Sequence, residues 1–232
     1  MPPTYWLVMP AAGKGERMGM AGTRVPKQYQ TLAGRAVIEH ALAPFRADPA
    51  CIGLVVALAP GDTAFARLPL AADPRIATVT GGASRADSVR AGLLAVAARV
   101  GVADTWVLVH DAARPCLSPA DLARLLAALG DAPDGALLGI PIADTLKRAD
   151  EAGRVSATVP RQGLWRAATP QAFLLKRLLG ALGAHPAATD EAGAVEATGG
   201  RPLLVAGSPG NLKLTTPADL GLAACILAGE RP

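Results

Sequence analysis

The sequence predicts an α/β fold, a three-layer sandwich in which helices cover both faces of a mostly parallel, doubly wound sheet. Three observations support this class. Short runs that are nearly all apolar recur along the chain, as is typical of parallel strands buried on both faces. Amphipathic helical stretches separate these runs, and several of the stretches open with polar helix-start signals. The resulting βαβα rhythm favours a doubly wound sheet.

The apolar runs define five expected strands. They are Tyr5–Met9, Gly53–Leu58, Ala77–Thr80, Trp106–His110 and Ala136–Ile140. Each run is short and almost free of charge, so we expect it to lie in the interior of the sheet.

The helices are marked by periodicity and by their first residues. In Arg85–Val100 the apolar side chains fall on one helical face. The segments Ser118–Asp121 and Thr216–Asp219 each place a capping hydroxyl, then proline, then a carboxylate at the third helical position. Ser84 followed by Asp87 is a weaker version of the same signal. We therefore expect helices to begin at these three places.

Length and composition favour one globular domain spanning residues 1–232. A chain of 232 residues can bury roughly 70–75% of its unfolded surface. A hydrophobic fraction of 51% and a charged fraction of 18% are ordinary for a folded protein. The net charge of +4 comes without a run of cations interleaved with aromatics, so we expect no nucleic-acid partner.

Cysteine and histidine usage points to a reducing compartment and to no metal cluster. Three cysteines show no C-x-x-C spacing and are expected to be small apolar fillers, and the three histidines are scattered. The N-terminus has neither a charged segment nor a long apolar stretch, and no run is long enough to cross a membrane. We therefore expect a cytoplasmic protein with no membrane partner.

Residues 142–161 break the βαβα rhythm. The segment is polar, contains the turn-like Asp150–Gly153, and continues with the β-prone Val155–Val159. We predict a protruding β-hairpin arm outside the main sheet. An isolated hairpin with so little apolar content is unstable alone, so we expect the arm to pack on a second subunit and form a homodimer. A solvated insertion is the alternative.

A glycine-rich loop, Pro10–Gly19, directly follows the first expected strand. Such a loop is where phosphate meets backbone N–H groups in α/β folds. Its spacing excludes the dinucleotide fingerprint, because Met18 stands where the third glycine is needed, and Lys14 is misplaced for a Walker loop. Arg17 in the loop and Lys27 after it could neutralise a triphosphate. A plain turn remains open.

Two further motifs follow strands. Gly81–Val89 opens a helix, and its paired glycines would allow a flat ring to approach the backbone; a simple capped helix start is the alternative. In His110–Pro115, a carboxylate at the carboxyl end of a central strand lies where α/β folds bind ligands. Asp111 could hold Mg²⁺ and Arg114 could clamp a phosphate, or the two could form only an ion pair.

The remaining polar motifs are weak when each is taken alone. Thr189 would be a helix cap, Thr169-Pro170 a turn, and Lys213 a surface cation. Together, however, seven motifs occur in the following order along the chain: P-A-A-G-x-G-x-R-M, P-K-Q-Y, G-G-x-x-R-x-D-S-V, H-D-A-A-R-P, T-P-Q, T-D-E and N-x-K-x-T-x-P-x-D. In this order they resemble the 2-C-methyl-D-erythritol 4-phosphate cytidylyltransferase family of the non-mevalonate isoprenoid pathway. The resemblance spans about Leu7 to Leu227.

The resemblance implies a reaction. CTP and 2-C-methyl-D-erythritol 4-phosphate would give 4-diphosphocytidyl-2-C-methyl-D-erythritol and pyrophosphate, with Mg²⁺ as cofactor. It also implies a Rossmann-like sheet whose arm exchanges between two subunits. The attacking phosphate monoester is mostly dianionic near neutral pH, so no general base is needed, and catalysis would be positioning plus charge neutralisation.

The resemblance also implies a role for individual residues. The catalytic cations would be Arg17, Lys27 and Lys213. CTP would be bound by Pro10, Ala11, Ala12, Gly13, Gly15, Gly82, Ala83, Ser88, Asp111 and Ala112. The phosphorylated acceptor would be placed by Asp111, Arg114, Thr145, Arg161, Thr169 and Thr189. Asp111 would also be the candidate metal ligand. Ala83 departs from the family pattern, which often has an acidic residue there.

Two other functions stay open from the sequence. A ribitol 5-phosphate cytidylyltransferase would keep the chemistry and change the acceptor. A non-catalytic nucleotide-binding module is a different class, which the intact set Arg17, Lys27, Asp111 and Lys213 argues against. The loop spacing disfavours a nicotinamide oxidoreductase.

Overall fold

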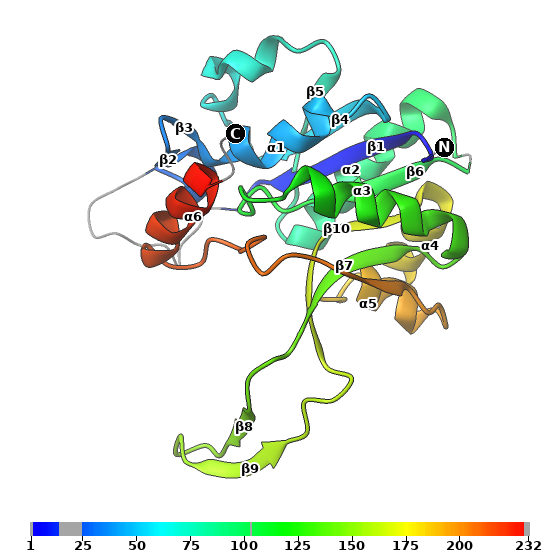
Figure 1. Ribbon diagram of the computed structural model, residues 1–232. Coiled ribbons are helices and arrows are strands. Elements are labelled where there is room, and N and C mark those ends of the chain that lie inside the picture. Colours follow the sequence, from blue (N-terminus) through cyan, green and yellow to red (C-terminus); the bar gives the residue numbers. More distant parts are fainter. Residues whose placement is uncertain (1, 14–24, 103, 230–232) are drawn as a thin grey trace.

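A computed structural model of the chain describes residues 2–13, 25–102 and 104–229, and its fold is the expected α/β class. A seven-stranded sheet with the order β11-β7-β10-β6-β1-β4-β5 forms the centre (Figure 1). The strands are β1 (Tyr5–Ala11), β4 (Cys51–Leu58), β5 (Ile76–Thr80), β6 (Trp106–Val109), β7 (Ala136–Pro141), β10 (Trp165–Leu174) and β11 (Leu203–Ala206). Strand β10 runs antiparallel to both of its neighbours, and the other pairs are parallel.

The remaining elements are helices and two small sheets. The α-helices are α1 (Val37–Ala47), α2 (Arg85–Val100), α3 (Pro119–Ala128), α4 (Leu175–Ala184), α5 (Glu191–Ala197) and α6 (Ala218–Gly229). Short 3₁₀ helices are η2 (Lys27–Tyr29), η3 (Phe65–Arg67), η4 (Pro69–Ala72) and η5 (Leu129–Asp131). Strands β2 (Thr31–Leu32) and β3 (Arg35–Ala36) pair with each other, as do β8 (Leu146–Ala149) and β9 (Val155–Val159).

Side-chain alternation along β1 divides the core into two layers. Tyr5, Leu7 and Met9 pack in one apolar cluster with residues of α1 and α3. Val8 points to the other face and packs with residues of α2, α4 and α5. This period of two, with apolar residues on both faces, is what a central parallel strand requires. Helices therefore cover both faces of the sheet (Figure 1).

All five expected strands are present, with ends that differ by at most two residues. Two strands of the main sheet, β10 and β11, were not expected. The interpretation of Thr169-Pro170 as a turn is wrong, because both residues lie inside β10, where they are joined by a cis peptide bond. The strand register with β7 shifts between Ala167 and Gln171, so the proline interrupts the ladder without ending the strand.

The helix-start signals are confirmed, and α2 has the predicted bounds. The Asp87 amide donates to Ser84 Oγ over 3.0 Å, and the Ser84 amide donates to the Asp87 carboxylate over 3.1 Å. Gly101 ends α2 with a φ of 74°, a conformation that favours glycine. Ser118 caps α3, because its Oγ accepts from the Asp121 amide over 3.1 Å. Helix α6 begins at Ala218, one residue later than expected.

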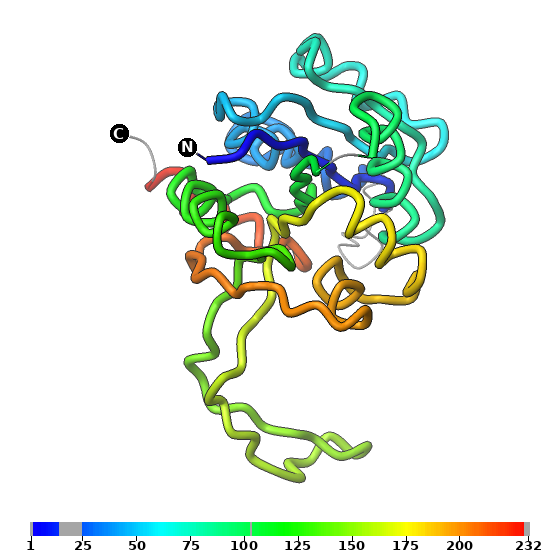
Figure 2. Tube along the Cα trace, turned by 90° about the vertical axis from the view of Figure 1, so that its right-hand side faces the viewer, coloured from blue at the N-terminus to red at the C-terminus, as the bar shows by residue number. Residues whose placement is uncertain are grey.

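The predicted arm is present as a hairpin that projects from the body in both views (Figures 1 and 2). Strands β8 and β9 pair antiparallel, and the turn between them contains Gly153 with a φ of 75°. Most arm side chains are exposed, and Val155 keeps 66% of its surface in contact with solvent. In one chain the arm thus buries little apolar surface of its own.

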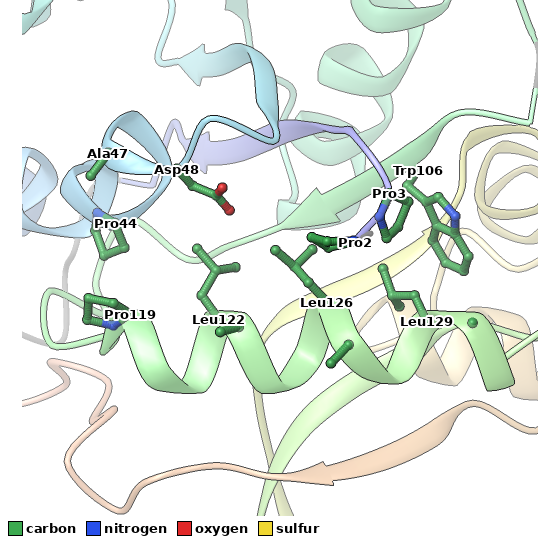
Figure 3. A pocket seen from close by; sticks show the side chains of 13 residues that line it. Pro2, Pro3, Pro44, Ala47, Asp48, Trp106, Pro119, Leu122, Leu126 and Leu129 are labelled. Carbon is green, nitrogen blue, oxygen red and sulfur yellow. The ribbon is translucent and has the colours of Figure 1, made fainter.

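A cavity of about 810 Å³ lies between the end of α1 and one face of α3. Pro44, Leu122 and Leu126 line it together with Trp106, as Figure 3 shows. Trp106 is the first residue of β6, so the cavity lies toward the amino end of that strand. The loops after β1, β5 and β6, which carry the predicted site residues, follow the opposite ends of their strands.

No helix among the described residues is long and apolar enough to cross a membrane.

Candidate active site

The loops after β1, β5 and β6 meet at one edge of the sheet, because the carboxyl ends of parallel strands share an edge. The first two loops are in direct contact. A Cβ atom added to Gly81 would lie 2.6 Å from the Cβ of Ala12 and 2.8 Å from Ser88 Oγ. Only glycine fits at that position, and the contact brings the Pro10–Gly13 segment against the start of α2.

Gln28 fixes the first of these loops. Its side chain is buried, and Nε2 donates to the carbonyl of Ala11 over 2.8 Å and to that of Gly13 over 3.4 Å. Gln28 lies in η2 beside Lys27, so these bonds place the predicted cation next to the loop. Arg17 and Gly15, two other predicted site residues, lie outside the described residues.

The hydroxyl of Ser88 is used within the protein. Ser88 Oγ accepts from the Gly82 amide over 3.2 Å and donates to the Ser84 carbonyl over 3.0 Å. The side chain is buried. Ser88 therefore holds the loop Gly81–Ser84 onto the first turn of α2, and one lone pair of its oxygen remains for a ligand.

Asp111 is the centre of a charged cluster. The residue is 6% exposed. Its carboxylate accepts from Arg85 Nε over 2.9 Å through one oxygen and from Lys213 Nζ over 2.8 Å through the other. Arg114 Nε lies 3.8 Å from it. Burial alone would raise the pKa of Asp111, but Arg85, Lys213 and Arg114 together hold that pKa well below its usual range. Asp111 is ionised and surrounded by cations.

Arg85 links Asp111 to a second buried carboxylate. Its Nη1 and Nη2 donate to the two oxygens of Glu191 over 2.7 and 3.0 Å, which is bidentate geometry. Glu191 is 1% exposed. Burial lowers the pKa of Arg85, but the two carboxylates more than offset this and raise it, so Arg85 keeps its charge.

A chain of hydrogen bonds fixes the backbone behind Asp111. The Asp111 amide donates to Thr169 Oγ1 over 3.1 Å, and Thr169 Oγ1 lies 3.0 Å from His110 Nδ1. His110 Nε2 lies 3.1 Å from the carbonyl of Arg114 and must donate to it. Nδ1 is then the acceptor from Thr169, so His110 is the neutral tautomer protonated at Nε2.

His110 is fully buried against Phe45, and burial lowers its pKa to about 4. An unfolded histidine takes up a proton below its ordinary pKa of about 6.5. The folded protein takes up this proton only near pH 4, so the stability that His110 contributes is present above about pH 6.5 and lost as the pH falls toward 4.

Replacing His110 by glutamine removes this titration. Between about pH 7 and pH 4.5 we expect the parent to lose about 2–3 kcal/mol more unfolding free energy than His110→Gln does. Urea denaturation of both proteins at the two pH values measures the difference. Equal losses in both proteins would show that folding does not lower the pKa of His110, so that the folded protein is already protonated there at about pH 4.5.

Arg114 has a donor available within the cluster. Its Nη1 donates to the carbonyl of Asn211 over 2.8 Å, and Asn211 Nδ2 donates to the carbonyl of Thr169 over 2.8 Å. Arg114 Nε is buried and has no hydrogen-bond partner among the described residues. A buried guanidinium N–H without a partner is a position where an anionic oxygen would be stabilised.

The segment before α5 is held by Gln171 of β10. Gln171 Nε2 donates to Asp190 over 2.9 Å, and Gln171 Oε1 accepts from the Ala192 amide over 2.8 Å. The expectation that Thr189 caps this helix is wrong: the cap is Asp190, which accepts from the Gly193 amide over 2.8 Å. Thr189 is exposed one residue earlier.

The structure brings together some predicted residues and leaves others apart. Asp111, Arg114, Thr169 and Lys213 form one cluster. Lys213 is therefore an ion-pair partner rather than an isolated surface cation. Thr145 and Arg161 are exposed on the arm, which projects away from the body of the same chain (Figure 1). The Arg161 guanidinium donates to the carbonyl of Ala143, also on the arm.

Sequence reasoning assigned no role to four members of the cluster. They are Arg85, Glu191, Gln171 and Asn211, and all four stand inside the quoted motifs. Arg85 and Glu191 are 106 residues apart in the chain, so no local pattern joins them. The available signal was that each of these two charged residues stands at the start of an apolar, alanine-rich helical stretch.

The described residues contain no group of three or more His, Cys, Asp or Glu side chains that could hold a metal ion by themselves. Asp111 is the carboxylate at the centre of the cluster, and both of its oxygens already accept from cations. A magnesium ion that is bound mainly by substrate phosphates needs only one or two protein carboxylates. The donor set therefore fits an ion that arrives with a nucleoside triphosphate.

Comparison with known proteins identifies similar chains over nearly the full length. Residues 5–229 match the family model for 2-C-methyl-D-erythritol 4-phosphate cytidylyltransferase. Proteins of that name from Halorhodospira halophila and Ectopseudomonas mendocina are 53% and 51% identical over 234 and 220 residues. The alignments cover 98% and 93% of this chain and 95% and 92% of the relatives.

Solved structures also match this chain over nearly its full length. A 4-diphosphocytidyl-2C-methyl-D-erythritol synthase is 42% identical, with a TM-score of 0.82, and the match covers 97% of this chain and 99% of that one. The 2-C-methyl-D-erythritol 4-phosphate cytidylyltransferase from Thermus thermophilus is 30% identical with a TM-score of 0.78, at the same coverage.

Proposed function

Because the chain belongs to the 2-C-methyl-D-erythritol 4-phosphate cytidylyltransferase family, we propose that the cluster around Asp111 is the catalytic centre of its reaction. The enzyme transfers a cytidylyl group from CTP to 2-C-methyl-D-erythritol 4-phosphate. The observation that carries the site assignment is the set of cations, Arg85, Arg114 and Lys213, gathered on one buried carboxylate at the carboxyl edge of the sheet.

On this proposal CTP lies over the loops after β1 and β5. One side of the proposed CTP groove is formed by Pro10, Ala11, Ala12 and Gly13. The other side is formed by Gly82, Ala83 and Ser88. The close contact between Ala12 and Gly81 supports a single groove. Asp111 and Ala112 close it from β6. Gly15 and Arg17 complete the loop in the proposal but lie outside the described residues.

The acceptor phosphate would approach from the side of Arg114 and Thr169. Arg114 Nε supports this placement, because it lies 3.8 Å from Asp111 without forming a hydrogen bond and can offer a charge-assisted bond to a phosphate oxygen. The exposed hydroxyl of Thr189 would contact the same substrate. One acceptor phosphate oxygen bonds to the α-phosphorus of CTP, and the bond from that phosphorus to the bridging oxygen breaks to release pyrophosphate.

The protein's part in this step is charge neutralisation. Lys27, Lys213 and Arg17 would stabilise the charge that develops on the α-phosphoryl group and on the departing pyrophosphate. Mg²⁺, held by the phosphates with Asp111 as its candidate protein ligand, would add positive charge there when it is bound. Neutral, buried His110 takes no part as a base, which fits an acceptor that is already ionised.

The proposal extends to a homodimer built through the arm. Thr145 and Arg161 would bind the acceptor, yet both belong to the arm, which projects away from the body of the same chain (Figure 1). They can serve a site only if the arm reaches a second copy of this chain. The exposed apolar side chains of Val155 and Leu164 on the arm and its stem support such packing. A cytoplasmic location and the single domain 1–232 remain predictions.

Pyrophosphate release tests the reaction directly. The purified chain is incubated with Mg²⁺, each of the four nucleoside triphosphates, and either 2-C-methyl-D-erythritol 4-phosphate or ribitol 5-phosphate. We expect release only with CTP and the methylerythritol acceptor. Release with ribitol 5-phosphate would reassign the acceptor, and CTP binding without turnover would make the chain a nucleotide-binding module.

A further inference from the structure

We propose that Arg85 and Glu191 form a positioning pair, which holds Asp111 in its catalytic orientation and ties it to the segment that precedes α5. This inference rests on the proposed function, because it assumes that Asp111 acts in cytidylyl transfer. Neither residue is assigned a contact with CTP or the acceptor, and their effect on the reaction passes through Asp111.

The geometry of the guanidinium supports a positioning role. Both terminal nitrogens of Arg85 are bound to Glu191, over 2.7 and 3.0 Å. A bidentate pair fixes the plane of the guanidinium, so its third donor direction is also fixed. That donor, Nε, lies 2.9 Å from Asp111 Oδ1. If the pair served only to join α2 to α5, the bond to Asp111 would be unnecessary.

The distribution of charge on Asp111 supplies the functional consequence. Arg85 donates to Oδ1 of Asp111, and Lys213 donates to Oδ2 over 2.8 Å. If Arg85 were removed, the carboxylate would be free to turn toward Lys213 and Arg114 and bind them more strongly. Lys213 would then be less available to a triphosphate. By holding Oδ1, Arg85 limits how strongly Asp111 binds Lys213, and so keeps the lysine charge accessible to substrate.

The pair also connects the two ends of the acceptor site. Glu191 is 1% exposed and directly follows Thr189 and Asp190, the segment expected to contact the acceptor. Asp190 is itself anchored by Gln171 over 2.9 Å. Hydrogen bonds through Glu191 and Arg85 therefore connect the Thr189 segment to the carboxylate of Asp111.

A double-mutant cycle tests whether Arg85 acts through Asp111. Arg85→Gln is made in the parent and in Asp111→Asn, and pyrophosphate release is followed with enzyme in excess so that low rates remain measurable. We expect Arg85→Gln to lower kcat/KM about 30-fold in the parent, but less than about 3-fold in Asp111→Asn. An equal loss in both backgrounds, or none in the parent, would overturn the inference.

Controls separate positioning from general damage. Arg177 forms a partly exposed ion pair with Asp134 away from the cluster, so Arg177→Gln should keep the parent rate. If Arg85→Gln does not fold, Glu191→Gln, whose side chain has the same size as the native one, is used in the same cycle. We then expect a loss of about 10-fold in kcat/KM in the chain that keeps Asp111, and none in Asp111→Asn. If Asp111→Asn alone keeps the parent rate, the assigned role of Asp111 fails and this inference with it. If Asp111→Asn is impaired and Arg85→Gln is not, only this inference fails.

Discussion

Lys213→Ala is expected to lower kcat/KM for cytidylyl transfer about 1,000-fold, with an equal fall in kcat. The ammonium lies 2.8 Å from Asp111 and the Lys213 side chain is 38% exposed, so the ammonium can leave this carboxylate and contact incoming phosphates. Its charge matters most when negative charge builds on the leaving pyrophosphate, which is why kcat should fall together with kcat/KM.

The fold should survive this change. Asp111 would keep Arg85 as a close partner, so the buried carboxylate would not be left without a cation. We expect a loss of at most about 1 kcal/mol in unfolding free energy, as for other partly exposed ion pairs. Lys176→Ala, an exposed lysine on α4, is the matched control and should retain the parent rate. A Lys213→Ala enzyme within threefold of the parent would remove Lys213 from the catalytic machinery.

Local signals in the sequence were sufficient to predict much of the fold. The bounds of α2 are those predicted, because both of its ends are set by neighbouring residues: the Ser84–Asp87 capping box and Gly101. The arm hairpin follows in the same way from a turn and a β-prone flank. Strand β10 was missed because Thr169-Pro170 is a turn signal by composition. It is a strand because β6 and β7 pair with it on either side.

The site could be predicted only in part, for a related physical reason. The loops after β1, β5 and β6 were found because each follows an apolar run. The role of Lys213 was implied only by family resemblance, since the contact that matters joins it to Asp111, about a hundred residues away in the chain. The Arg85–Glu191 pair is of the same kind. Such contacts are created by the topology, and no window of the sequence contains both partners.

Mixing two inactive chains should restore activity if the arm serves a partner's site. Arg161→Ala changes the arm, and Lys213→Ala changes the body. We expect each variant alone to be strongly impaired. In a heterodimer of the two, one site combines the intact body of the first with the intact arm of the second. Co-expressed, differently tagged chains purified through both tags should therefore show about half the parent activity, since one of two symmetric sites is whole.

For either arrangement of the arms, a matched control heterodimer should give the opposite result to the heterodimer of the two single variants. A chain carrying both substitutions is paired with the parent in the same way. If arms exchange, the parent body receives the altered arm and the heterodimer is nearly inactive. If each arm serves its own chain, the parent subunit is intact, and this control shows half activity while the mixed single variants show almost none. Because each arrangement gives a high value in one heterodimer and a low value in the other, misfolding cannot imitate either result. Failure to recover any doubly tagged dimer would contradict the proposed assembly itself.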